Sequence, residues 1–243
     1  MRQGDRTDDR EVPFHGFSAG RRPLLRGPGA PQRPRLVPGA QAALPGGRAR
    51  PGARLRRGDG RAAASLAPQI QFDPRTDGSG SIFRIHRDVR FSKDKSPYKT
   101  HLGIFFWEGQ RKWGPGFYFH LEPPRLQLYV GKYVFDKEEL ATWRAAVADP
   151  TRGAALARLT AKIEKKGYEL GGQRYKRVPA GFAADHPRAE LLKHDSVWVR
   201  RDGPVPAELR SRDLLDFCQA HFKAMSPLHG WLREFSLKSD ANA

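Results

Sequence analysis

The side chains best suited to chemistry are concentrated in one short stretch of the chain. Between positions 84 and 99 lie several cations, among them Arg84, Arg87, Arg90, Lys95 and Lys99, and the carboxylates in this stretch are Asp88 and Asp94. A guanidinium group offers a planar fork of donors that matches the oxygens of a carboxylate or a phosphate. Such a set could hold a phosphate, a nucleotide or the acidic end of a peptide. We therefore predict a binding site for an anionic ligand, formed by Arg84, Arg87, Asp88, Arg90, Asp94, Lys95 and Tyr98.

Two other interpretations of this stretch remain open. Arg and Asp at neighbouring positions can form an internal network with a structural role, and removing one partner of a buried pair costs about 3–5 kcal/mol. The stretch can also belong to an enzyme, such as a hydrolase acting on a phosphorylated substrate, with Asp88 or His120 as the base. An enzyme requires that base within hydrogen-bond reach of a cleft that the arginines also line. The sequence supports no choice between an enzyme and a binding domain.

A second group of polar side chains follows the alternation of a predicted strand over residues 117–122. Tyr118, His120 and Glu122 alternate there with apolar residues, so they share one face of the strand, and His86 could lie on the same side. A His/Glu pair can carry out acid–base chemistry or bind a metal. The chain has no His-x-x-x-His or Cys-x-x-Cys spacing, however. We predict a polar outer sheet face, with no metal site and no particular cofactor.

Nucleic acid and membranes are weaker candidates as partners. Aromatic residues near two cations could stack on bases, although aromatics at strand spacing are more often core residues; they are Trp107, Trp113, Phe117 and Tyr118, near Arg111 and Lys112. No apolar run approaches the roughly 20 residues of a membrane span. The only cysteine, Cys218, excludes an intramolecular disulfide and suits a reducing compartment. We expect a cytoplasmic protein that does not associate with a membrane.

The first 65 residues differ in composition from the rest of the chain. They contain 14 Arg and no Lys, with 11 Gly and 8 Pro, and they show neither helical nor strand periodicity. The formal net charge is +18, and half of it comes from this segment. It can be a disordered basic tail, or GC-rich DNA translated out of frame, because Arg, Gly, Pro and Ala all use GC-rich codons. Back-translation of residues 24–47 in a shifted frame permits an N-D-R-x-W-F element, and sequencing the gene tests this hypothesis.

The remaining residues predict one domain over 66–235, followed by a flexible tail over 236–243. The expected strands cover residues 81–91, 99–107, 117–122, 125–130 and 196–200, with a hairpin over 168–178 around Gly171-Gly172. The expected helices begin at the caps Asp136 and Thr151, near Pro187, at Ser211, and at Ser226-Pro227. Strand pairs followed by helices indicate an α+β fold, in which a mostly antiparallel sheet carries helices packed on one face.

The run from Arg84 to Tyr98 also resembles the hallmark of a known family. It contains every fixed position of the pattern R-x-x-R-D-x-R-F-x-x-D-K-x-x-Y, which is typical of domain-of-unknown-function family 2461, an uncharacterised and largely bacterial family. Residues 116–122, 175–182 and 185–192 are similar too, so the resemblance covers roughly residues 66–234. The family normally begins with helices that carry an N-N/D-R-x-W-F element, from which this sequence departs. The resemblance implies no activity.

Overall fold

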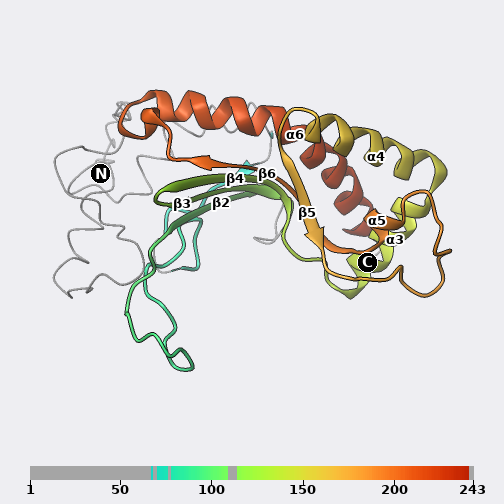
Figure 1. The fold of residues 1–243 in the computed structure, drawn as a ribbon, viewed down its shortest axis with the longest axis horizontal. Helices are drawn as coiled ribbons and strands as arrows, with labels where there is room; N and C mark the ends of the chain where they lie inside the picture. Colours follow the sequence, from blue (N-terminus) through green and yellow to red (C-terminus); the bar gives the residue numbers. More distant parts are fainter. Residues whose placement is uncertain (1–66, 68–69, 76–77, 109–113, 241–243) are drawn as a thin grey trace, which may run out of the picture.

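The fold is that of a computed structural model, which describes residue 67 and residues 70–75, 78–108 and 114–240, with side chains as far as position 234. The predictions for residues 1–65 lie outside the described residues. Figure 1 shows a curved sheet with the long helix α6 (Asp213–Asp240) along one side, and with the helices α3, α4 and α5 gathered beyond one end of the sheet. The predicted α+β class is confirmed.

In the described part of the chain, one antiparallel sheet contains six strands in the order β1-β2-β3-β4-β6-β5. The strands are β1 (Ile70–Gln71), β2 (Leu102–Glu108), β3 (Gly116–Glu122), β4 (Arg125–Lys132), β5 (Glu169–Gln173) and β6 (His194–Pro204). The predicted strands over 117–122, 125–130 and 196–200 are found within β3, β4 and β6. The strand expected over 99–107 begins later, at Leu102.

The side chains of the central strands divide the sheet into a buried and a polar face. Phe117, Phe119 and Leu121 of β3 are buried and alternate with Tyr118, His120 and Glu122. On β4, Leu126, Leu128 and Val130 are fully buried on the same side, because the antiparallel register places them opposite Leu121, Phe119 and Phe117. The apolar face packs against α6, where Phe117 meets Phe222 edge to face at 5.4 Å. We call the opposite side the polar face.

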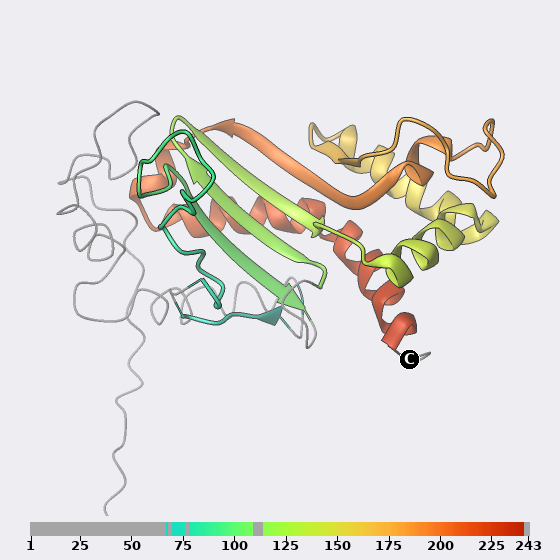
Figure 2. The ribbon, with the colours of Figure 1, turned by 90° about the horizontal axis from the view of Figure 1, so that it is seen from below.

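The helix α6 covers the apolar face as one continuous element. Its buried side chains include Leu214, Phe222, Met225, Leu228 and Leu232, which extend on both sides of Pro227. The prediction of a separate helix from Ser226-Pro227 was therefore wrong. Proline removes one helical hydrogen bond and bends a helix, and α6 does change direction along its length in Figures 1 and 2. The helix continues to Asp240, within the segment predicted as a flexible tail, and residues 241–243 lie outside the described residues.

Two of the helices beyond the end of the sheet share a capping residue. The helices there are α3 (Lys137–Ala148), α4 (Pro150–Glu164) and the single turn α5 (Ala189–Leu192), and a 3-10 turn, η1 (Ala207–Arg210), precedes α6. The predicted capping box of α3 is confirmed, because Asp136 and Glu139 each accept from the other's backbone N–H. Thr151 was the wrong cap for α4. Asp149 ends α3 and caps α4, and its carboxylate accepts from the backbone N–H groups of Thr151 and Arg152.

The segment expected as a strand over 81–91 forms no regular strand. Ile82 makes an isolated bridge to Ile104, and His86 makes another to Tyr98. Burial still alternates with a period of two from Phe83 to Arg90, but no neighbouring strand continues the ladder. Residues 83–100, which we call the arm, leave the sheet and fold back on themselves. The arm projects from the sheet on the side away from α6 (Figure 1, teal to green).

The hairpin expected over 168–178 is also absent, because its first half pairs with a distant strand. Gly171 lies opposite Trp198 of β6, and a Cβ atom there would come within 2.1 Å of the Trp198 ring. Gly172 has φ of +104° beside a register shift in the same pairing. The two glycines therefore accommodate an indole ring and a bulge, where a turn was predicted.

Candidate functional site

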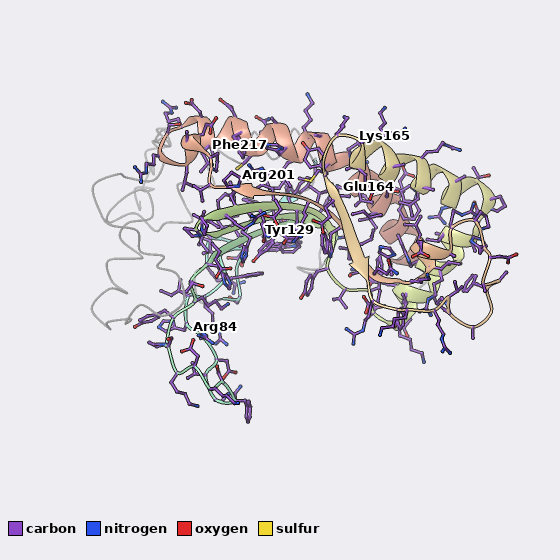
Figure 3. The ribbon with its side chains drawn as sticks, viewed as in Figure 1. Arg84, Tyr129, Glu164, Lys165, Arg201 and Phe217 are labelled. Atoms are coloured by element: carbon purple, nitrogen blue, oxygen red, sulfur yellow. The ribbon has the colours of Figure 1, made fainter. Side chains whose placement is uncertain are left out.

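The arm brings the sequence-predicted ligand residues onto two antiparallel segments. The backbone N–H of Lys99 donates to Ile85 (2.7 Å) and that of Arg87 donates to Pro97 (2.9 Å). The ring of His86 lies over that of Tyr98, with centroids 5.3 Å apart. The predicted residues thus belong to one structural unit, which Figure 3 shows with Arg84 labelled.

Two of the arginines are paired with carboxylates inside the arm. Arg87 donates to Asp94, and Arg90 donates to Asp88 with Nη2 2.6 Å from Oδ2. The hydrogen bonds from Ser96, followed by the contact with Arg87, lower the pKa of Asp94 to about 2. The hydrogen bonds from Arg90 lower the pKa of Asp88. The Arg90 side chain is 77% exposed and that of Asp94 is 58% exposed, so these pairs lie in contact with solvent, whereas an internal network would be buried.

Lys95 fastens the tip of the arm to its first segment. Its Nζ atom donates to the carbonyl oxygen of Val89 at 3.0 Å, and the backbone N–H of Ser96 donates to Asp94 at 2.9 Å. Phe91 lies at this tip and is 95% exposed. A strand over 81–91, as expected from the sequence, would bury Phe91 on its apolar face, but no sheet continues beneath the tip.

Arg84 and Lys99 form a cationic pair at the base of the arm. Lys99 lies opposite Ile85, and the charge of the neighbouring Arg84 acts on its ammonium group. Burial, followed by the positive charge of Arg84, lowers the pKa of Lys99. Within the described residues, neither side chain has a hydrogen bond or a carboxylate partner, in contrast to Arg87 and Arg90. This place therefore concentrates positive charge, although the charge of Arg84 also acts on the Asp88 carboxylate.

The polar face of the sheet continues from this base with two histidines and a glutamate. His101 follows the arm directly, and its ring lies 4.7 Å from that of His120 on β3. His120 Nε2 lies 3.6 Å from Glu122 Oε2, and the Tyr118 hydroxyl lies 3.2 Å from His120 Nδ1. Burial, followed by the charges of His120 and Lys99, lowers the pKa of His101. A hydrogen bond from Thr100 lowers the pKa of Glu122.

Farther along the polar face, the cations have acidic partners. Arg125 donates to Asp202 at 2.8 Å, and Gln127 donates to the other oxygen of Asp202 at 3.0 Å. Arg200 donates to Glu169 at 2.9 Å and lies over the Trp198 ring. Tyr129, labelled in Figure 3, joins this network through Gln127 and Arg200. This part of the face is close to neutral, which sets it apart from the base of the arm.

Sequence reasoning found the arm but missed His101, which was assigned no role. The spacing rules that it used concern ligands within one segment, whereas His101 meets His120 because Gly103 pairs with His120 across neighbouring strands. Of the aromatics considered for base stacking, Phe117 is buried in the core. Arg111, Lys112 and Trp113 lie outside the described residues.

Comparisons with known proteins give one match. Residues 60–231 match the model of a family described as a conserved hypothetical protein (DUF2461). No curated protein and no solved structure matches the chain. Among the described residues, no helix has both the length and the apolar character that a bilayer crossing requires.

Proposed function

Since the chain belongs to the DUF2461 family, whose description names no activity, we propose from the site itself that the protein is a binding domain for a phosphate-bearing or other small anionic ligand. The ligand lies at the base of the arm, between Arg84 and Lys99. The other predicted residues, Arg87, Asp88, Arg90, Asp94, Lys95 and Tyr98, hold the arm in the conformation that presents this pair.

The proposal rests on one difference between these two cations and the nearby arginines, which is whether a carboxylate lies against them. Arg87, Arg90, Arg125 and Arg200 each lie against a carboxylate, and in the described part of the chain Arg84 and Lys99 do not. Two nearby positive charges repel each other, and an anion bound between them offsets this repulsion because it attracts both. The half-buried position of Lys99 strengthens such an attraction, because solvent screens it less.

The chemistry of the pair favours an anion with several oxygens. Arg84 offers a fork of donors and Lys99 offers a compact ammonium group, so a phosphate can bridge them with oxygens to spare. Hydrogen bonds that involve charged groups contribute about 1.5–3 kcal/mol each. Removing one of the two cations should therefore weaken binding roughly 10- to 100-fold, since about 1.4 kcal/mol corresponds to a factor of ten.

A thermal-shift experiment on the 243-residue chain tests the proposal. Inorganic phosphate, pyrophosphate and a nucleoside monophosphate are compared with chloride at matched ionic strength. We expect the phosphates to raise the melting temperature, because a ligand that binds only the folded state stabilises it. The Arg84→Ala and Lys99→Ala variants should lose most of this shift.

The matched control is Arg174→Ala, which also removes an exposed arginine but lies on a different segment, where Arg174 pairs with Asp195. Its phosphate-induced shift should equal that of the wild type. Equal shifts in all three variants, or no shift in the wild type, would contradict the proposal.

A further inference from the structure

Three potential metal ligands converge where the arm meets the sheet. His101, His120 and Glu122 each offer one ligand atom, and these atoms all lie within 4.8 Å of one another. In a tetrahedral site with zinc–ligand distances of 2.0–2.1 Å, the ligand atoms lie about 3.3–3.4 Å apart. Side-chain movements of less than about 1 Å would therefore close the set around one ion. His101 and His120 are half-buried and Glu122 lies at the exposed end of β3, so a bound ion would be partly shielded and still reachable.

Neighbouring residues orient these potential ligands by hydrogen bonds, as is usual around a bound metal. A ligating histidine almost always donates its second ring N–H to an acceptor, and a ligating carboxylate is itself hydrogen-bonded. His120 Nδ1 lies 3.2 Å from the Tyr118 oxygen, so donation to Tyr118 leaves the Nε2 lone pair directed toward Glu122. Thr100 donates to Oε1 of Glu122, which leaves Oε2 free on the side of His120. Two of the three ligands are thus already oriented.

Two of the three ligands lie on β3, and the third, His101, directly precedes β2. Glu122 and His120 are two residues apart on β3, so the pleat points both toward the polar face. Gly103 opposite His120 has no side chain, and the Tyr118 hydroxyl occupies the space that a Cβ atom would fill, 2.5 Å from its ideal position. The glycine therefore lets Tyr118 reach the place from which it supports His120.

From this geometry we propose that His101, His120 and Glu122 form a binding site for a divalent transition-metal ion, of which zinc is the best match. Two imidazoles and one carboxylate are the protein ligands of many open zinc sites, in which the fourth position remains for water or a ligand. Borderline metals such as zinc suit this mixture of nitrogen and oxygen donors, whereas calcium and magnesium prefer oxygen alone. The site uses different side chains from the Arg84–Lys99 pair, and it stands or falls independently of the proposed anion binding.

The test is zinc binding by the 243-residue chain, measured in buffer without phosphate or chelator by competition against a chromophoric chelator. We expect about one zinc ion per chain, and Co²⁺ in its place should give the visible absorption of a four- or five-coordinate site. His120→Gln and Glu122→Gln should each weaken zinc binding by at least about tenfold. His186→Gln removes a histidine from another part of the chain and should bind zinc as the wild type does.

Circular dichroism establishes that each variant is folded. Glu122 is the decisive position if His120→Gln does not fold, because its side chain is 47% exposed and glutamine keeps an acceptor for Thr100. Zinc affinity in the folded Glu122→Gln variant equal to that of the wild type, or no stoichiometric binding by the wild type, would overturn the proposal. Because no phosphate is present, this result is separate from the outcome of the phosphate experiment.

Discussion

At the scale of single residues, the contribution of an ion pair in this protein depends on where its partners lie. The Arg90–Asp88 pair is exposed at the tip of the arm, and exposed pairs contribute little to stability because water and salt screen them. The pair of Lys132 and Glu139 is different, because Nζ and Oε1 are 2.8 Å apart with side chains only 6% and 17% exposed. Burial makes the loss of one partner costly, since the other charge remains in a poorly solvated place.

Glu139→Ala should therefore destabilise the protein strongly. It removes the partner of Lys132 and also the acceptor for the backbone N–H of Asp136 at the start of α3. We expect the free energy of unfolding to fall by about 3–5 kcal/mol, measured by urea denaturation. Glu138→Ala, an exposed neighbour, should change it by less than about 0.5 kcal/mol. Similar effects of the two substitutions would contradict this account of the pair.

The residues of the arm could be predicted from the sequence, but their pairing could not. Composition and spacing identified Arg84 to Tyr98 as one cationic unit. They did not show that Arg87 and Arg90 would be matched by Asp94 and Asp88 while Arg84 would not. That difference depends on how the arm folds back, which places Lys99 opposite Ile85, the residue that follows Arg84. The role of His101 depends in the same way on the pairing of neighbouring strands.

At the scale of elements, the junction of α3 and α4 shows how one side chain ends one helix and begins the next. The backbone N–H of Asp149 donates to Ala145 at the end of α3, and its carboxylate accepts two N–H groups at the start of α4. Arg188 supports the same junction, since it donates to the terminal carbonyl groups of Val147 and Ala148. The two helices are thereby fixed relative to each other beside the sheet.

Asp149→Ala should lower the free energy of unfolding by about 1 kcal/mol, the usual contribution of an N-cap. Thr151→Ala should lower it by less than about 0.5 kcal/mol. The backbone N–H of Thr151 donates to the cap, and alanine keeps that group. Chemical denaturation of the two variants measures the difference. A larger effect at Thr151 than at Asp149 would restore the assignment made from the sequence.

Elements with strong local signals could be predicted well, and those that depend on distant partners could not. The alternation in β3 and β4 and the capping box of α3 are local properties. Gly171 and Gly172 resembled a turn because the strand with which they pair, around Trp198, is distant in the sequence. Pro227 resembled a helix start because the sequence does not show that Met225 and Leu228, on either side of it, are both buried against the sheet.

At the scale of the whole molecule, burial of several histidines links stability to pH. Burial is the main cause that lowers the pKa of His194, His221 and His229, and the positive charge of Arg201 or Arg233 adds to it for the last two. Glu108 opposes the shift at His229 without reversing it. The unfolded chain, in which histidine has a pKa of about 6.5, therefore binds protons in a range where the folded protein does not.

The sign of the effect follows from this difference in proton binding. As the pH falls through about 6.5, protonation favours the unfolded state, so stability is lost toward lower pH. We expect the melting temperature to decrease from about pH 7.5 to about pH 5.5. His194→Gln should make the profile less steep, because it removes one of the titrating groups. A melting temperature that rises over this range would contradict the direction of the shifts.

The positive charge is distributed unevenly between the first 65 residues and the rest of the chain. The net charge is +18, but half of it belongs to residues 1–65, and the match to the family begins at residue 60. The proposed anion binding therefore depends on the pair Arg84 and Lys99 and not on the overall basicity of the chain. The hypothesis that the first segment is translated out of frame stays a prediction, and the sequence of the gene decides it.

Calorimetric titration of pyrophosphate into the wild type, Arg84→Ala, Lys99→Ala and the double variant, with a chelator present to remove metal ions, tests whether the two cations bind an anion. We expect each single substitution to weaken binding by at least about tenfold and the double variant to show no measurable binding. Equal affinities in all four proteins, or no binding by the wild type, would contradict the proposed anion binding.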